Sequence, residues 1–167
     1  MRAADLVALF DYNAWANERI FDAAAGVTPE EFAAPTRFPR GSLRGSLLHV
    51  LAAQRAWRAW WADQPPPPRL AEDDYPDVAT LVARWREDEA ELRAYLASRT
   101  DDELHQPRTR AYPTFGVTVT APLWQFIVHI VTHSIQHRSD IAQMLTEVGR
   151  SPGDLDLIIS LPQAPIG

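Results

Sequence analysis

Hydrophobic residues recur with a helical period along four stretches of the chain that contain no proline. The clearest stripe lies in the third stretch and consists of Val78, Leu81, Val82, Trp85, Leu92, Tyr95 and Leu96. Because proline removes a helical hydrogen bond and clashes with the preceding turn, it collects where helices stop. The pattern therefore predicts four long helices, within Met1–Thr28, Arg40–Gln64, Asp77–Gln106 and Leu123–Ser151.

Shorter elements are predicted at the ends of these stretches and between them. Thr28–Glu31 and Thr100–Glu103 each have the spacing of a capping box, a hydroxyl followed three residues later by Glu, so each is expected to open a short helix. Gly26 and Gly149 are expected to act as C-caps of long helices. Alternating residues on either side of a Pro and Gly turn in Arg108–Thr120 predict a small hairpin just before the last long helix.

The size of the chain bounds the fold. A length of 167 residues with a hydrophobic content of 46% fits a single globular domain over residues 1–167 with a sizeable core. Four amphipathic helices of this length most simply form an all-α four-helix bundle.

Charge and apolar segments exclude several classes of protein. Sixteen Lys and Arg against 22 Asp and Glu give a formal net charge of −6 without a concentrated basic run, so we expect no nucleic-acid partner. Residues 1–12 lack the apolar block of a signal peptide, and no stretch reaches about 18 apolar residues, so we expect a cytoplasmic protein with no membrane partner. With no cysteine, the chain has neither disulfides nor thiolate ligands, which leaves histidine and carboxylate chemistry.

Three of the five histidines, His129, His133 and His137, are spaced four residues apart in the last long helix and share one face. The residues expected to point into the bundle share that face, so the histidines are expected to point inward. Two imidazoles one turn apart can bind one metal ion, but His129 and His137 lie about 12 Å apart along the helix, too far for all three to do so. Of the two remaining histidines, His49 in the second helix is a better third ligand than His105 in a predicted short helix or loop.

Two readings of these histidines remain open. Small neighbours of His49 such as Gly45 and Ala53 leave room beside its imidazole, which either lets another helix approach closely or accommodates a metal and a ligand. The inward histidines can also be polar core residues without a metal. The sequence lacks the glutamate of a His-Glu-x-x-His protease, the Glu-x-x-His pairs of a ferritin-like di-iron site and a Gly-x-Ser-x-Gly elbow.

Four segments spread along the chain carry recognisable motifs: Tyr12–Arg19 (YNAWANER), Leu48–Leu51 with Trp57, His129–Arg138 (HIVTHSIQHR) and Gly149–Ile158. With these motifs the sequence resembles the DinB/YfiT-like family of metalloenzymes over nearly its whole length. The resemblance implies a four-helix bundle in up-down-down-up order, often a homodimer. The long Pro-rich link from Gln64 to Pro76 would carry the crossing that this order needs.

The resemblance also implies a metal site and a type of chemistry. It places the three metal-binding histidines of the family on His49, His133 and His137. Three imidazoles leave a coordination position open, as in catalytic zinc sites, and we expect one divalent ion, zinc or nickel. Characterised relatives include S-transferases and isomerases that use a low-molecular-weight thiol, which implies a small-molecule substrate and such a thiol as partner.

The sequence departs from the family pattern at two positions. Ser139 and Asp140 follow His137-Arg138 where the family commonly has Gly-Gln, and Asp140 lies on the histidine face. Its carboxylate either accepts a hydrogen bond from a ligand imidazole or pairs with an arginine. Gln54 stands where family members often carry an acidic residue, which puts in doubt any role for a carboxylate there.

The leading hypothesis is a metal-dependent enzyme that activates a thiol or water against a small electrophile, by S-transfer or hydrolysis. His129 and Asp140 are the candidate catalytic residues, and the candidate pocket residues are Tyr12, Trp15 and Trp60. Arg138 lies about 140° around the helix from His133, which suggests a surface or intersubunit salt bridge. The alternatives are a non-catalytic metal- or small-ligand-binding dimeric bundle in stress response and a purely structural bundle.

Overall fold

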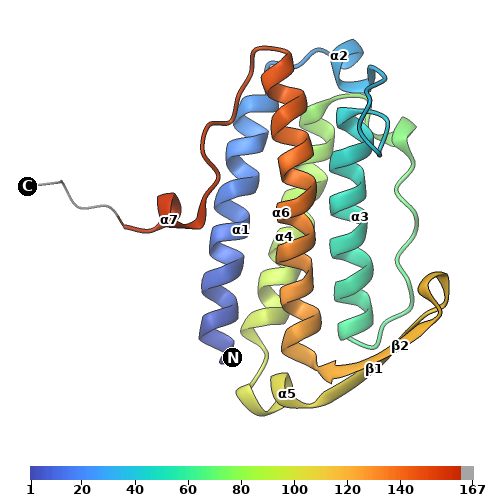
Figure 1. Ribbon diagram of the computed structural model, residues 1–167, viewed down its shortest axis with the longest axis vertical. Coiled ribbons are helices and arrows are strands. Elements are labelled where there is room, and N and C mark those ends of the chain that lie inside the picture. The colour runs from blue at the N-terminus through green and yellow to red at the C-terminus, as the bar shows by residue number, and fades with distance from the viewer. Residues whose placement is uncertain (163–167) are drawn as a thin grey trace, which may run out of the picture.

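Each of the four proline-free stretches contains one long helix. In the computed structural model, which describes residues 1–162, these are α1 (Ala3–Ala24), α3 (Leu43–Trp61), α4 (Val78–Ala97) and α6 (Leu123–Glu147). The shorter elements are α2 (Pro29–Ala33), η1 (Glu72–Asp74), α5 (Asp101–His105), β1 (Pro107–Tyr112), η2 (Pro113–Phe115), β2 (Val117–Pro122) and α7 (Leu157–Ser160). The structure is thus mostly helical with one small sheet (Figure 1).

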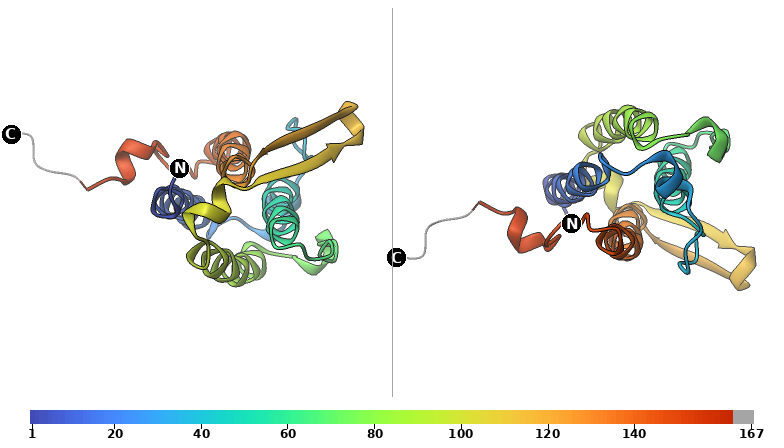
Figure 2. Two further views of the ribbon diagram at one scale, coloured as in Figure 1. Left: turned by 90° about the horizontal axis from the view of Figure 1, so that it is seen from below. Right: turned by 90° about the horizontal axis from the view of Figure 1, so that it is seen from above.

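The long helices lie side by side and pack as a bundle. Helix α6 packs against both α1 and α3, and α4 packs against the other sides of the same two helices. The end-on views in Figure 2 show the four helices at the corners of a square, with α1 and α3 on one diagonal. Helices α3 and α6, which carry the candidate metal ligands, are therefore direct neighbours.

The core consists of two hydrophobic clusters, one toward each end of the bundle. One includes Ile20, Leu47, Leu51, Leu81 and Leu145, and the other includes Phe10, Trp61, Leu92, Ile127 and Ile130. Near their junction every long helix contributes buried polar residues, which we call the polar layer: Asn13, Asn17, Gln54, Asp88, Ser134, His137 and Arg138. Within this layer, Gln54 donates a hydrogen bond of 2.7 Å to the carboxylate of Asp88. The polar groups of neighbouring helices thus satisfy part of one another's bonding capacity.

The helix ends follow the predicted signals with one exception. The hydroxyls of Thr28 and Thr100 accept hydrogen bonds from backbone N–H groups three residues on, so both capping boxes are confirmed. Gly149, just beyond α6, has the left-handed backbone (φ 75°) of a helix-ending glycine. The prediction for Gly26 is wrong, because its φ is not positive. A Cβ there would instead collide with the guanidinium of Arg150, which lies over this turn.

The predicted hairpin is confirmed. Strands β1 and β2 pair antiparallel, with Pro107 opposite Pro122, and lean away from the helices on the side of α3 (Figure 2). Arg108 ties the base of the hairpin to the end of α3, because its guanidinium donates to the carboxylate of Asp63 and to the carbonyl of Trp60. This anchor fixes which β1 side chains face α3.

The connection between α3 and α4 is long and proline-rich. In Figure 1 it leaves the lower end of α3, runs back along the outer side of that helix and enters α4 at the upper end. It therefore covers one side of α3 close to the candidate site. Among residues 1–162, no helix is long and apolar enough to cross a membrane.

Candidate metal centre

The structure brings three imidazoles together between α3 and α6. His133 and His137 lie one turn apart on α6, and His49 faces them from α3. Their ring centroids are 4.5 to 5.0 Å apart, and one ligand nitrogen from each lies within 4.8 Å of the others. The packing of α3 against α6 thus supplies the third imidazole that one helix cannot.

The geometry and the donor set fit a divalent ion. The Nε2 atoms of His49 and His133 are 3.2 Å apart. Two nitrogens bound to one tetrahedral zinc at about 2.0 Å would lie roughly 3.3 Å apart. Imidazole nitrogen is a preferred ligand of zinc, nickel, copper and iron. The three residues can therefore hold a metal without rearrangement of their helices.

The electrostatics keep these imidazoles neutral, as metal ligands must be. Burial, helped by the charge of Arg40 and the neighbouring histidine, lowers the pKa of His49 to about 4. Burial and the other histidines lower the pKa of His133 to about 4 as well. Burial and Arg40 also lower the pKa of His137, against the opposing charge of Asp140. At neutral pH each ring therefore has a free lone pair.

The same pKa shifts predict how pH changes the stability of the metal-free protein. An unfolded histidine titrates near pH 6.5, whereas His49 and His133 stay neutral in the folded state down to about pH 4. As pH falls through this window, the unfolded state takes up protons that the folded state does not, so the free energy of unfolding should decrease. Urea unfolding of metal-free protein at several pH values between about 6.5 and about 4 measures this decrease.

A variant separates this effect from the titration of carboxylates. His133→Asn removes one of the two strongly shifted imidazoles, so its urea midpoint should fall less between about pH 6.5 and about pH 4 than that of the unchanged protein. An identical fall in both proteins would contradict the prediction.

His129 lies beside the cluster, and Trp60 lies farther along α3. His129 is exposed one turn before His133 on α6, with 5.9 Å between their ring centroids and 4.9 Å to the ring of Trp57. Trp60 packs edge-on against both Trp57 and Phe126. Of the two, only His129 has a ring contact with a clustered histidine within residues 1–162.

Asp140 is less closely engaged than His129. It is half-buried one turn after His137, and it acts on that ring only through its charge. The Nδ1 atoms of His133 and His137 are buried and have no hydrogen-bond partner among residues 1–162. The structure therefore does not place the carboxylate of Asp140 as an acceptor for Nδ1 of either imidazole.

Two expected pocket residues have their contacts elsewhere. The hydroxyl of Tyr12 donates to the carbonyl of Leu155, and its ring lies 5.6 Å from the guanidinium carbon of Arg138. Trp15 packs against Tyr12 and under Arg19. Among the described residues neither has a ring contact with a histidine, so the geometry does not support a pocket role for them.

The expectation of a surface or intersubunit salt bridge for Arg138 is wrong. Arg138 is only 3% exposed, and its Nη1 donates hydrogen bonds of 2.6 and 2.9 Å to the side-chain oxygens of Asn13 and Asn17 on α1. Helix α6 is covered by α3 on one side and by α1 on another. A residue pointing away from the histidines therefore enters a second buried contact instead of solvent.

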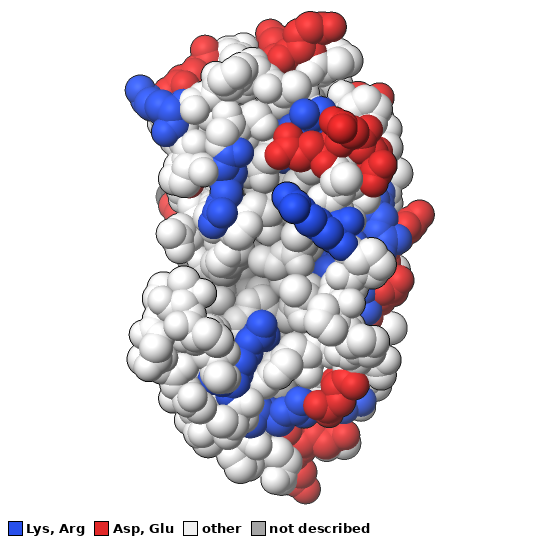
Figure 3. Space-filling view, turned by 90° about the vertical axis from the view of Figure 1, so that its right-hand side faces the viewer, with Lys and Arg blue, Asp and Glu red and all other residues white. Residues whose placement is uncertain are grey.

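Sequence reasoning missed the arginines around the histidines. Arg40 is exposed in the loop before α3, and Arg110 on β1 lies over the rings of Trp57 and Trp60. A groove of about 370 Å³ between α3 and the proline-rich connection is lined by His49, Arg55 and Arg69, among others. Figure 3 shows basic side chains around a hollow on this face. The alternation around Arg110 predicted a strand, but no local signal located the arginine beside the histidines.

Comparison with known proteins agrees with the motifs in the sequence. The sequence model of the DinB family matches residues 1–164. Protein DinB of Bacillus subtilis (strain 168) is 24% identical over 153 residues, which cover 89% of this chain and 88% of that protein. The range matched by the family model includes all three clustered histidines.

Proposed function

The chain belongs to the DinB family, and from this membership and the histidine cluster we propose that it is a metal-dependent enzyme. In this proposal His49, His133 and His137 hold one divalent ion, zinc or nickel. The reaction is either transfer of a thiol to a small electrophile or hydrolysis of a small electrophile. The observation that carries the proposal is the convergence of three neutral imidazoles from two helices at one point.

The proposal includes the finer features that the family resemblance implies. It takes residues 1–167 as a single domain with its long helices in up-down-down-up order, and the connection that runs back along α3 supports that order. It also includes assembly as a homodimer and a low-molecular-weight thiol as co-substrate, which a chain without cysteine would have to obtain from outside.

The residues of the chain divide the chemical work. A divalent ion at this site would lower the pKa of a thiol or water, so that the deprotonated form is available as a nucleophile near neutral pH. His129 lies beside the cluster with part of its side chain exposed. The partial burial of its ring and the charge of Arg110 lower its pKa, so a ring nitrogen can accept a proton at pH 7. Trp57, which contacts His129, is itself held by Phe126 in stacked geometry with 5.9 Å between ring centroids.

A second candidate function rests on a specific observation. In this proposal His129 is the acid or base next to the cluster, 5.9 Å from His133 between ring centroids, and among residues 1–162 no hydrogen bond joins Asp140 to Nδ1 of His133 or His137. A non-catalytic bundle that binds a metal or small ligand needs no such group. This alternative predicts metal binding without turnover.

Removal of the metal tests the enzyme proposal. We expect protein treated with a chelator to react mercaptoethanol with chlorodinitrobenzene, or to hydrolyse nitrophenyl acetate, no faster than the background. One equivalent of zinc or nickel should restore activity.

His129→Gln should keep the metal and lose about 100-fold or more of the restored rate, because a positioned acid or base contributes about that much. His105→Gln is the matched control and should leave the rate unchanged, since His105 is exposed in α5. Equal rates with and without metal would contradict the proposal.

A further inference from the structure

Arg110 is held flat against aromatic rings beside the candidate metal centre. The carbon of its guanidinium lies 4.0 Å from the ring centroid of Trp57, 5.0 Å from that of Trp60 and 5.8 Å from that of Tyr112. A guanidinium that lies over a ring contacts it through its face, and this contact does not satisfy the N–H groups at its edge.

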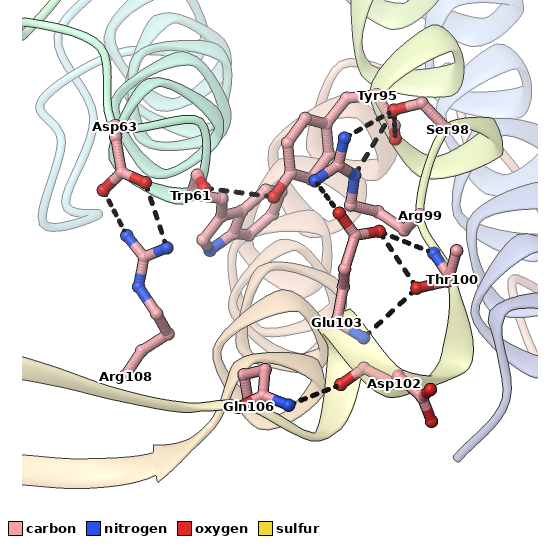
Figure 4. A network of polar contacts seen from close by, with 10 residues as sticks. All are labelled: Trp61, Asp63, Tyr95, Ser98, Arg99, Thr100, Asp102, Glu103, Gln106 and Arg108. Atoms are coloured by element: carbon pink, nitrogen blue, oxygen red, sulfur yellow. Dashed lines mark hydrogen bonds and ion pairs between the residues drawn. The ribbon is translucent and has the colours of Figure 1, made fainter.

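No acceptor for these N–H groups is present within residues 1–162. The side chain of Arg110 has neither an ion pair nor a hydrogen bond there, and its Nη1 is buried without a partner, while its backbone pairs with Val119 of β2. Arg108, two residues earlier on the same face of β1, instead forms a two-pronged ion pair with Asp63 (Figure 4). A buried donor without an acceptor costs free energy, so the arrangement favours an acceptor that comes from outside the chain.

A path of contacts connects Arg110 with the histidine cluster. The ring of Trp57 touches both the guanidinium of Arg110 and the imidazole of His129, and His129 in turn lies next to His133. Arg40 adds a second cation that acts on all three clustered imidazoles. Arg110 therefore acts on His129 and Arg40 acts on the clustered histidines, with Asp140 as an opposing charge at His137 and the rings of Trp57 and Trp60 next to Arg110.

We propose that Arg110 binds a carboxylate group of the substrate, so that the enzyme selects small anionic substrates. A carboxylate offers two oxygens in the plane of a guanidinium edge, and this two-pronged, charge-assisted pairing adds both strength and geometric specificity. The rings of Trp57 and Trp60 hold the guanidinium in place for this contact. The inference rests on the proposed function, because it names the substrate class of that site.

The test compares succinate with succinamide, which has the same carbon skeleton and no charge. Isothermal titration calorimetry at constant ionic strength would measure both ligands with metal-free and zinc-loaded protein, and elemental analysis would give the metal content of each sample. Arg110→Gln keeps polarity and removes the charge. Arg150→Gln is the matched control, because it removes one positive charge at the turn near Gly26, far along the chain from β1.

We expect succinate to bind at least tenfold more tightly than succinamide in one or both metal states. Arg110→Gln should weaken succinate binding about tenfold or more and leave succinamide and the metal content unchanged, whereas Arg150→Gln should change neither by more than about twofold. Equal binding of the two ligands, no succinate binding in either metal state, or unchanged succinate binding in Arg110→Gln would overturn the inference. Succinate selectivity through Arg110 in a protein that holds no zinc would support the inference and count against the metal-dependent enzyme.

Discussion

Replacement of His133 or His137 by alanine will remove the metal from the purified protein. Each variant leaves two imidazoles in place of three, and loss of even an outer hydrogen-bond partner of a metal ligand costs roughly 10- to 100-fold in affinity. We expect about one zinc or nickel per chain in the unchanged protein and essentially none in either variant after dialysis, with the same result for His49→Ala. Inductively coupled plasma mass spectrometry on protein without an affinity tag measures the content.

The chain provides its own controls for this experiment. His129 is one turn from His133 but outside the cluster, and His105 is exposed in α5, so His129→Ala and His105→Ala are the control variants. Both variants should retain the metal. Far-ultraviolet circular dichroism should show the same helix content in all variants, since the clustered histidines lie on helices whose hydrophobic faces are untouched. Metal retention in both His133→Ala and His137→Ala would refute the assignment of this site.

The largest effect on stability is expected from Arg138. Its guanidinium is buried in the polar layer, where it donates to Asn13 and Asn17. Arg138→Ala leaves two buried amide oxygens without a donor and opens a cavity, and each unsatisfied group costs about 1–3 kcal/mol. We expect the free energy of unfolding to fall by about 3 kcal/mol, measured by urea denaturation of metal-free protein.

A compensating variant tests the reason for that loss. When both partners of a buried polar contact are replaced by apolar groups of similar shape, much of the stability returns. The triple variant Arg138→Met, Asn13→Leu, Asn17→Leu should therefore be clearly more stable than Arg138→Ala. A loss below about 1 kcal/mol in Arg138→Ala would show that these hydrogen bonds contribute little.

Local patterns were sufficient to predict most of the secondary structure. Proline positions and the helical period located the four long helices, and the two capping boxes located α2 and α5. These signals act within a few residues, so a single sequence contains them in full. The spacing of His133 and His137 is likewise local, and the position of His49 on a long helix already favoured it over His105 as third ligand, a choice that the family resemblance then supported.

Contacts between distant segments account for what the sequence did not reveal. The environment of Arg138 depends on α1, which packs against α6 and contacts this residue. A helical wheel of α6 that is oriented by its histidines assigns that side of the helix to solvent. The position of Arg110 depends on the anchor between Arg108 and Asp63, which lie 45 residues apart. Neither partner can be recognised before the packing of the helices is known.

The polar layer also determines the alignment of the helices. Hydrophobic stripes alone tolerate a slide by one turn, about 5.4 Å, because similar apolar side chains then meet. In this bundle such a slide would move the charge of Asp88 or Arg138 into a hydrophobic cluster and leave it without its partners, which is costly. His137 belongs to the same layer, so the correct alignment of α6 also keeps His133 and His137 level with His49. A misaligned bundle would thus lose its stability and its histidine cluster together.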